Sequence, residues 1–366
     1  MTGPAAAVRP LRLGQLEAPS PVVLAPMAGV TNRPFRELCR SFGPGLFVSE
    51  MITARALVEG RAATLRMVGF GPGEVPRSLQ LHGTDPGTVA SAVGLVVAQD
   101  LADHVDLNFG CPVPKVTRKG GGAAFPWKLG RFREVVGRAV EASGGAVPVT
   151  VKLRLGLDAA HLTCIDAALA AEGVGAAAVT LHARTAAQLY SGRAEWNAIG
   201  HLKSLVKTIP VLGNGDVFSG DDAVALMTQT GCDGVVVGRG CQGRPWLFAD
   251  IAAALAGRPQ RVRPSLGWVC GVVRRHAQAL VEYLGDEGAG LRELRGHMSF
   301  YLRGYPVGGA ARAAAHAIGS LSDLERLFDL LDLDAPYPGD AAEGPRGRRG
   351  SERPPVLPEG WLDSRD

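Results

Sequence analysis

An alternation of short apolar runs with helical patterns is the feature that most restricts the fold of this chain. Apolar runs predict eight strands, at 21–26, 46–50, 78–83, 104–110, 147–153, 177–183, 210–215 and 234–239. Segments between them, such as PGTVASAVGLVVAQ and FREVVGRAVEAS, carry apolar residues three and four positions apart, as amphipathic helices do. Eight such repeats predict a parallel sheet closed into a (β/α)8 TIM barrel, and an open doubly wound sheet is the alternative.

The predicted strands share a second property, because each ends in a polar residue or in a glycine or proline turn. The C-terminal ends of barrel strands meet on one face, and the chemistry of barrel enzymes gathers there. This regularity favours the closed barrel and predicts one shared site. The strand-end residues are Pro26, Met27, Glu50, Gln80, Asn108, Lys152, Leu153, Arg154, His182, Asn214, Gly215, Asp216, Gly238 and Arg239.

The pattern changes after about residue 250. The segment SLGWVCGVVRRHAQALVEYLG (265–285) places its apolar residues on one helical stripe, and two further helical patterns follow it. Nine arginines and four acidic residues lie between 258 and 312. We therefore predict a barrel domain at 1–256 and a small, basic helical domain at 257–335. Residues 336–366 are rich in proline and glycine and are predicted to be disordered.

Composition restricts the class of protein. With 366 residues, 46% of them hydrophobic and 20% charged, the chain can bury a large core, and its net charge of +4 says little about polyanionic partners. The six cysteines form no C-x-x-C pair, which argues against a zinc site and a disulfide framework. We expect free thiols in a reducing cytoplasm and no metal. No run approaches the ~18 apolar residues of a membrane span.

Two glycine-rich segments follow the seventh and eighth predicted strands. GRGCQG (238–243) fits G-x-G-x-x-G, but no acidic residue stands ~20 positions later at a second strand end, so it does not indicate a dinucleotide fold. Together with GNGD (213–216), it stands where barrels commonly bind phosphate, because glycines let backbone N–H groups approach an anion. Ordinary barrel turns are the alternative.

Three side chains at neighbouring strand ends suggest a heterocycle site. A cation such as Lys152 at the end of a buried strand needs a counter-charge. An electron-rich ring could supply it, or an acid such as Glu50. Gln80 and Asn108 each offer a donor and an acceptor, as the imide-like edge of a flavin or a uracil requires, although each alone could be a structural amide.

The segment LNFGCPVPKV (107–116) holds Cys111 between Gly110 and two prolines, just after a strand. A buried cysteine is usually a small hydrophobic residue, as we expect for Cys39 and Cys164. In a non-helical loop at the barrel mouth, a thiol with a reference pKa of ~8.5 is protonated at neutral pH and can donate a proton. It could instead act as a nucleophile once deprotonated, but no local base supports a hydrolase.

Six motifs together resemble the tRNA-dihydrouridine synthase family, from about residue 12 to 330. They are LAPMAGVTNRPFR (24–36), DLNFGCPVPKVTRKGGGAAF (106–125), PVTVKLRLG (148–156), LHARTAAQLYSGRAEW (181–196), PVLGNGDV (210–217) and DGVVVGRGCQGRPW (233–246). The resemblance implies an FMN-binding barrel followed by a helical domain that helps to hold tRNA. It also implies reduction of the C5=C6 bond of uridines, with NADPH as the electron source.

The resemblance assigns roles residue by residue. Cys111 would be the general acid that protonates C5 after hydride reaches C6 from reduced FMN, and Asn108 and Arg154 would contact the substrate. The remaining positions would bind FMN. Its ring would lie against Pro26, Met27, Ala28, Gln80, Lys152 and His182, and its phosphate against Asn214, Gly215, Asp216, Gly238 and Arg239.

The chain departs from the family pattern at Asn32, where aspartate is expected, and at Ala183, where glycine is expected; the loop GGGAAFPW also differs. Three other functions stay open. An FMN-dependent dihydropyrimidine or dihydroorotate oxidoreductase would need no basic helical domain. A phosphate-binding lyase or isomerase would be colourless, and an inactive tRNA-binding protein would not need Cys111 and Lys152. We expect a cytoplasmic monomer with tRNA and NADPH as partners.

Overall fold

Eight parallel strands close into a barrel in the computed structural model, which describes residues 9–346 and 351–366. Val235 pairs with Val22 on one side and with Gly213 on the other, so the first and last strands are neighbours and the sheet has no edge. The predicted barrel and all eight strands are confirmed, and the open sheet is wrong. The strands are β3 (Val22–Leu24), β4 (Leu46–Thr53), β5 (Ser78–His82), β6 (His104–Phe109), β7 (Val149–Arg154), β8 (Ala178–His182), β9 (Val211–Asn214) and β10 (Gly234–Val237).

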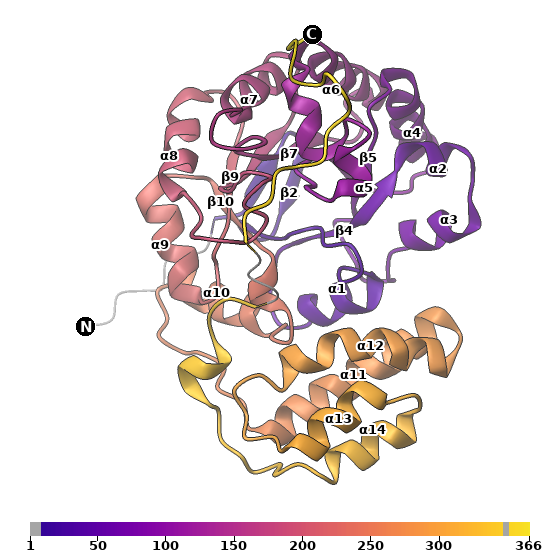
Figure 1. Ribbon diagram of the computed structural model, residues 1–366, viewed down its shortest axis with the longest axis vertical. Helices are drawn as coiled ribbons and strands as arrows, with labels where there is room; N and C mark the ends of the chain where they lie inside the picture. The colour runs from indigo at the N-terminus through magenta and orange to yellow at the C-terminus, as the bar shows by residue number, and fades with distance from the viewer. Residues whose placement is uncertain (1–8, 347–350) are drawn as a thin grey trace.

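Helices follow the strands and surround the barrel (Figure 1). Their apolar faces pack on the outward side chains of the sheet, which are largely Val, Leu and Phe. The α-helices are α1 (Arg33–Arg40), α2 (Ala54–Val58), α3 (Ala62–Val68), α4 (Pro86–Ala98), α5 (Pro114–Thr117), α6 (Leu129–Ser143), α7 (Cys164–Gly173), α8 (Trp196–Leu205), α9 (Gly220–Thr230) and α10 (Leu247–Leu255). Two 3₁₀ turns, η1 (Gly122–Trp127) and η2 (Arg239–Cys241), follow β6 and β10.

A short antiparallel hairpin packs against side chains inside the barrel. Its strands, β1 (Leu11–Leu13) and β2 (Leu16–Ala18), bury Leu11, Leu13 and Ala18 against interior residues such as Val23 and Leu212. The hairpin lies at the end opposite the loops that follow the strands, because it contacts the starts of β3 and β8. Sequence reasoning missed it, since three-residue strands are too short to show a period of two.

One side of the barrel interior is polar. Along β5, β6 and β7, alternate residues are apolar and face the helices, while the residues between them are polar. Strand register aligns these polar residues into layers, with Ser78 beside His104, and Asp106 beside both Gln80 and Thr150. They are buried, and each bonds to its neighbours, so these side chains fix one another's orientation.

The helices after the barrel enclose a hydrophobic core of their own. They are α11 (Leu266–Leu284), α12 (Glu287–Tyr301), α13 (Gly309–Ala317) and α14 (Leu321–Phe328). This helical unit docks on α1, where Phe35 packs against His276 and His297, and where Asn32 donates to Glu293 at 2.5 Å. Across residues 9–346 and 351–366, no helix combines the length and hydropathy needed to cross a bilayer.

The proline- and glycine-rich tail differs from the expected disorder. After η3 (Gly339–Ala342), the chain returns from the helical unit and passes in front of the barrel to reach α6 (Figure 1). Arg346 is buried and Trp361 is half-buried. The tail has no core of its own, so composition alone suggests disorder, but the Arg346 side chain bonds to the Phe300 carbonyl of the helical unit and Trp361 docks onto the barrel. Residues 347–350 of the predicted tail and 1–8 of the predicted barrel domain lie outside the described residues.

We expect the protein to lose stability between pH 6.5 and pH 4 because of two buried histidines of the helical unit, one on α11 and one on α12. Burial lowers the pKa of His297 to about 4 and holds the pKa of His276 well below its ordinary value. Between pH 6.5 and pH 4 the two imidazoles bind protons in the unfolded chain but not in the folded chain. Their contribution to the free energy of unfolding is therefore complete above pH 6.5 and is lost as the pH falls. His297 alone accounts for about 2 kcal/mol at pH 5.

Urea unfolding at pH 7 and at pH 5 measures this loss. His297→Phe should reduce the difference between the two pH values, whereas His201→Phe, at an exposed position, should leave it unchanged. An equal difference in wild type and His297→Phe would contradict the assignment.

Candidate active site

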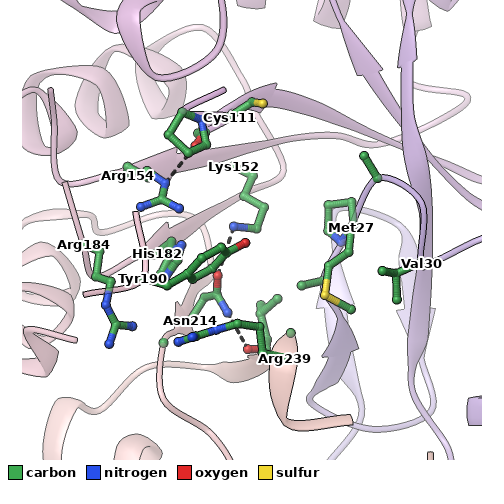
Figure 2. Close-up of a pocket in the computed structure, with 18 of the residues that line it drawn as sticks. Met27, Val30, Cys111, Lys152, Arg154, His182, Arg184, Tyr190, Asn214 and Arg239 are labelled. Atoms are coloured by element: carbon green, nitrogen blue, oxygen red, sulfur yellow. Dashed lines mark hydrogen bonds between the residues drawn. The ribbon is translucent and has the colours of Figure 1, made fainter. Parts of the chain in front are cut away.

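A cavity of about 470 Å³ opens at the C-terminal ends of the barrel strands (Figure 2). The structure places every site residue predicted from the sequence on its lining. Figure 2 shows Lys152, Arg154, His182 and Tyr190 on one side of this cavity and Met27 and Val30 on the other. The predicted residues that line it are Pro26, Met27, Ala28, Gln80, Asn108, Cys111, Lys152, Arg154, His182, Asn214, Gly215, Asp216, Gly238 and Arg239.

Cys111 lies at the rim of the cavity in the loop after β6. Asn108 holds this loop, because its side-chain oxygen accepts from the backbone N–H groups of Gly110 at 3.3 Å and Cys111 at 3.0 Å. Arg154 fastens the loop from β7 by donating to the Gly110 carbonyl at 2.9 Å. Cys111 is half-buried, whereas the other five cysteines are buried. Burial raises the pKa of the Cys111 thiol, so it is protonated at neutral pH.

A chain of buried hydrogen bonds fixes the orientation of Asn108. Asp106 accepts from Gln80 Nε2 at 2.7 Å, so the Gln80 oxygen turns toward Asn108 and accepts from its Nδ2 at 2.8 Å. Asn108 must then present its oxygen to the Cys111 loop. Below them, Thr150 donates to Asp106 and contacts His104 at 2.9 Å. Gln80 and Asn108 thus already bond to each other. A ligand can form hydrogen bonds only with the donor and acceptor positions of the two amides that remain.

Lys152 points into the cavity from β7, and its Nζ donates to the Asn214 side-chain oxygen at 3.0 Å. Asn214 is oriented by its own bond to the Val236 carbonyl at 2.7 Å. Burial lowers the pKa of Lys152. The counter-charge considered from the sequence is elsewhere, because Glu50 accepts from the Gly29 N–H. A negatively charged ligand in this cavity would therefore stabilise the Lys152 ammonium.

His182 is neutral and stands among cations. Burial first, and then the charges of Arg154, Lys152, Arg184 and Arg239, hold its pKa well below the ordinary value. A neutral imidazole offers one donor and one acceptor to a ligand. The concentration of positive charge around it favours an anionic occupant.

The loops after β9 and β10 fit a phosphate group. Gly215 has φ +137, and a Cβ there would lie 2.6 Å from the Ala194 Cβ, so only glycine allows this backbone path. The Asp216 carboxylate accepts from Arg184 at 2.7 Å and pairs with Arg239 at 3.5 Å, which gathers two guanidinium groups at the loop. Arg184 Nη1 is buried and has no partner among the described residues. An anion at these loops would supply that partner.

The apolar part of the cavity and its amides fit a planar heterocycle. Met27, Val30 and Met51 contribute apolar surface, while Gln80 and Lys152 contribute polar groups on the β5–β7 side. The residues present therefore fit a flavin that carries a phosphate group, since the same cavity offers apolar surface, amides, an ammonium and the glycine loops. The described residues contain no cluster of three or more metal-ligating side chains.

Sequence reasoning missed three aromatic residues at this cavity, Tyr190, Phe218 and Phe300. Tyr190 lies 4.2 Å, ring centroid to Cζ, from the Arg239 guanidinium, and it is 39% exposed. Its position inside the motif LHARTAAQLYSGRAEW was the available signal. Phe300 reaches the cavity from α12 of the helical unit. No local pattern indicates Phe300, since its placement depends on how the helical unit docks.

The structure explains two departures from the family pattern. Asn32 caps α1 by accepting from the Phe35 N–H at 3.0 Å, and its amide nitrogen donates to Glu293. An aspartate at position 32 would face that carboxylate without a proton to share. Ala183 is buried, and its φ is not positive, so its methyl group needs no left-handed backbone.

Comparison with known proteins identifies relatives over most of the chain. The family model described as "Dihydrouridine synthase (Dus)" matches residues 23–331. A probable tRNA-dihydrouridine synthase of Mycobacterium tuberculosis (strain CDC 1551 / Oshkosh) is 52% identical over 364 residues, covering 97% of this chain and 93% of the relative. The tRNA-dihydrouridine synthase B of Pseudomonas putida is 39% identical over 309 residues, covering 84% and 90%.

Solved structures show the same fold at low sequence identity. Histamine dehydrogenase from Rhizobium sp. 4-9 matches with a TM-score of 0.52 and 15% identity, covering 88% of this chain and 63% of that chain. A 2-naphthoyl-CoA reductase matches with a TM-score of 0.51 and 13% identity, covering 69% and 52%. The structural likeness shows the barrel fold, and the sequence matches show that the chain belongs to the dihydrouridine synthase family.

Proposed function

We propose that this protein reduces specific uridines in tRNA to 5,6-dihydrouridine with a bound flavin. Family membership supports the reaction, and the two relatives described above carry the name tRNA-dihydrouridine synthase. The observation that carries the proposal is that one cavity gathers a protonated thiol, a half-buried ammonium and two phosphate-type glycine loops.

The cofactor proposed for this cavity is FMN, reduced by NADPH. When bound, it supplies the hydride that C6 of the uracil ring accepts. Gln80, Lys152 and the backbone of residues 26–28 would hold its ring, with His182 beside it. The phosphate would lie at Asn214, Gly215, Asp216, Gly238 and Arg239, where Arg184 also has a buried, unpartnered nitrogen.

Cys111 is the proposed general acid. As C6 gains hydride, negative charge develops on the uracil ring and C5 needs a proton. The raised pKa of Cys111 keeps that proton on the sulfur until it is needed, and Cys111 lines the cavity in which the base would be bound. Arg154 and Asn108 would contact the base, and both already fix the backbone of the Cys111 loop.

Transfer RNA is the proposed substrate, and its target base must leave the stack to reach the mouth of the barrel. The barrel domain, 1–256, would perform the chemistry. The helical domain, 257–335, would contact the RNA backbone through its excess of arginine. Contacts of this kind recognise the phosphates and the shape of the RNA more than its base sequence.

Two measurements test the function. The purified protein should be yellow, with the absorbance of an oxidised flavin that NADPH bleaches. Nuclease digestion and mass spectrometry of unmodified tRNA incubated with protein and NADPH should detect dihydrouridine. A yellow protein that reduces free uracil or orotate and leaves tRNA unchanged would instead identify the small-molecule reductase, and a colourless one that FMN does not reconstitute would end the proposal.

Gly215→Ala should lower the flavin content of the purified protein. The new methyl group would meet the Ala194 Cβ at 2.6 Å in a backbone conformation that costs about 1–3 kcal/mol for a side chain. The glycine loop must then shift away from the phosphate. Gly231→Ala is the matched control, because Gly231 also has positive φ, at +67, but ends α9 with open space around it. Equal ratios of visible to protein absorbance in the two variants would contradict a phosphate role for this loop.

A further inference from the structure

The last described segment of the chain, 351–366, which we call the strap, lies over the loops that form the mouth of the cavity. Its approach is anchored at Arg346, whose backbone carbonyl accepts from Arg239 at 3.2 Å in the loop after β10. The N–H of Arg353 then donates to the Ala187 carbonyl at 2.9 Å in the loop after β8. Trp361 reaches the loop after β6, where its Nε1 donates to the Ala124 carbonyl at 3.1 Å.

The tightest contacts of the strap fall on residues 120–129. The Trp361 ring lies over Gly120, where a Cβ would come within 2.4 Å of the indole. Lys128 holds the strap beyond this point, because its Nζ lies 5.3 Å from the Trp361 ring centroid and donates to the carbonyls of Ser364 at 2.7 Å and Asp366 at 3.2 Å. Trp361 and Lys128 thus join the strap to the loop after β6, residues 110–128, which we call the cysteine loop.

The strap also completes the start of α6. No side chain caps this helix, and the Leu129 N–H donates to the Arg365 carbonyl at 3.1 Å. The Arg365 side chain lies 5.1 Å over the Trp127 ring and pairs with Asp166 at 2.8 Å on α7. An unpaired N–H at a helix start needs a partner, and the strap supplies one.

Residues 120–129 are in turn packed against Cys111. The Ala123 N–H donates to the Cys111 carbonyl at 3.0 Å. Gly122 passes so close that a Cβ on it would lie 2.4 Å from that carbonyl and 3.1 Å from the Cys111 Cβ. A movement of this turn would therefore move Cys111. The backbone of residues 120–123 thus lies between Trp361 on one side and Cys111 on the other.

We propose that Trp361 is a positioning residue for Cys111, and that the strap fastens the cysteine loop at the mouth of the cavity. This inference rests on the proposed role of Cys111 for its effect on turnover, but its effect on the thiol itself does not depend on that role. The strap lies beyond residue 331, where the match to the family model ends, so it adds to the common barrel of the family.

The first test measures the reactivity of Cys111 in the full-length flavoprotein. Because the other five cysteines are buried, iodoacetamide should alkylate Cys111 first, and mass spectrometry of the digested protein gives its rate. Trp361→Ala should raise this rate several-fold, since a released loop samples open positions. Trp361→Phe keeps the ring over Gly120 and loses the bond to Ala124, so its rate should fall between the two. Glu359→Ala, at an exposed position of the strap, is the control and should match wild type.

The second test measures dihydrouridine formation by the same variants. Misplacing a proton donor by about 1 Å costs up to about 100-fold, so kcat should fall about 10- to 100-fold in Trp361→Ala while KM for tRNA changes little. Wild-type alkylation and kcat in Trp361→Ala would overturn the proposal. So would a faster enzyme, which would mean that the strap obstructs RNA. If wild type forms no dihydrouridine, the proposed function fails, and the alkylation rates still decide whether the strap holds the loop.

Lys128→Met provides a second check, because it removes the bonds to the Ser364 and Asp366 carbonyls and the cation–π contact with Trp361, and leaves the bond from Trp361 to Ala124 in place. It should raise Cys111 alkylation in the same direction as Trp361→Ala. If the five buried cysteines become reactive together with Cys111 in either variant, the substitution opens the barrel as a whole, and the strap is not a local support of the loop.

Discussion

Cys111→Ala should lower the rate of dihydrouridine formation by about 10²- to 10⁴-fold, which is the usual contribution of one general acid. The flavin should stay bound, since the cavity groups proposed to hold it are on other strands. In the proposed mechanism the thiol acts in its protonated form. The rate should therefore hold through neutral pH and fall only above about pH 8.5, as the thiol ionises, because burial raises the pKa of Cys111.

The measurement is single-turnover reduction of unmodified tRNA by the pre-reduced enzyme, with the visible spectrum as the check on flavin content. Cys164→Ala is the matched control, because Cys164 is a buried cysteine on the outer helix α7. It should retain the wild-type rate. Wild-type turnover in Cys111→Ala would remove the thiol from the mechanism and leave the proton to another group at the cavity rim.

Lys152→Met should lower turnover by about 10²- to 10³-fold, which is typical when one preorganised donor to developing negative charge is lost. Lys152 is half-buried, and its ammonium bonds to Asn214 at 3.0 Å and faces the cavity, so its charge acts where water screens it less than at the surface. Methionine preserves much of the side-chain volume, and the barrel should keep its packing. Lys152→Arg should not rescue the rate, because a planar guanidinium cannot occupy the position of a compact ammonium.

Turnover and flavin content should be measured together for Lys152→Met. Lys207→Met, which removes an exposed lysine between α8 and β9, is the control and should behave as wild type. Unchanged turnover in Lys152→Met would show that the ammonium serves only to orient Asn214.

The barrel could be predicted from the sequence because the patterns that indicate its strands and helices are local and repeated. Buried parallel strands are continuous apolar runs, and each one ends at a polar residue or turn, so β5 and β6 could be placed within one or two residues. The site followed from the same logic, since closure of the barrel brings the strand ends to one face. Cys111, Lys152 and Gly215 could therefore be assigned to one cavity without knowledge of any distance.

Contacts between distant segments could not be predicted. The partners of Lys152 depended on strand register, and the structure pairs it with Asn214 rather than Glu50. Phe300 reaches the cavity only because the helical unit docks on α1. Trp361 stands in a segment whose composition indicates disorder, and a single tryptophan carries no periodicity that reveals where it will bind.

The polar layers inside the barrel restrict how this chain can change in evolution. From His104 through Asp106 and Gln80 to Asn108, every group relies on the one before it for its orientation. A substitution of one of these residues leaves its neighbours without a hydrogen-bond partner in the interior. Each such unpaired group lowers the stability of the fold by about 1–3 kcal/mol. Viable descendants of this sequence should thus exchange these residues as a set, and an engineer who wishes to repack the barrel must redesign them together.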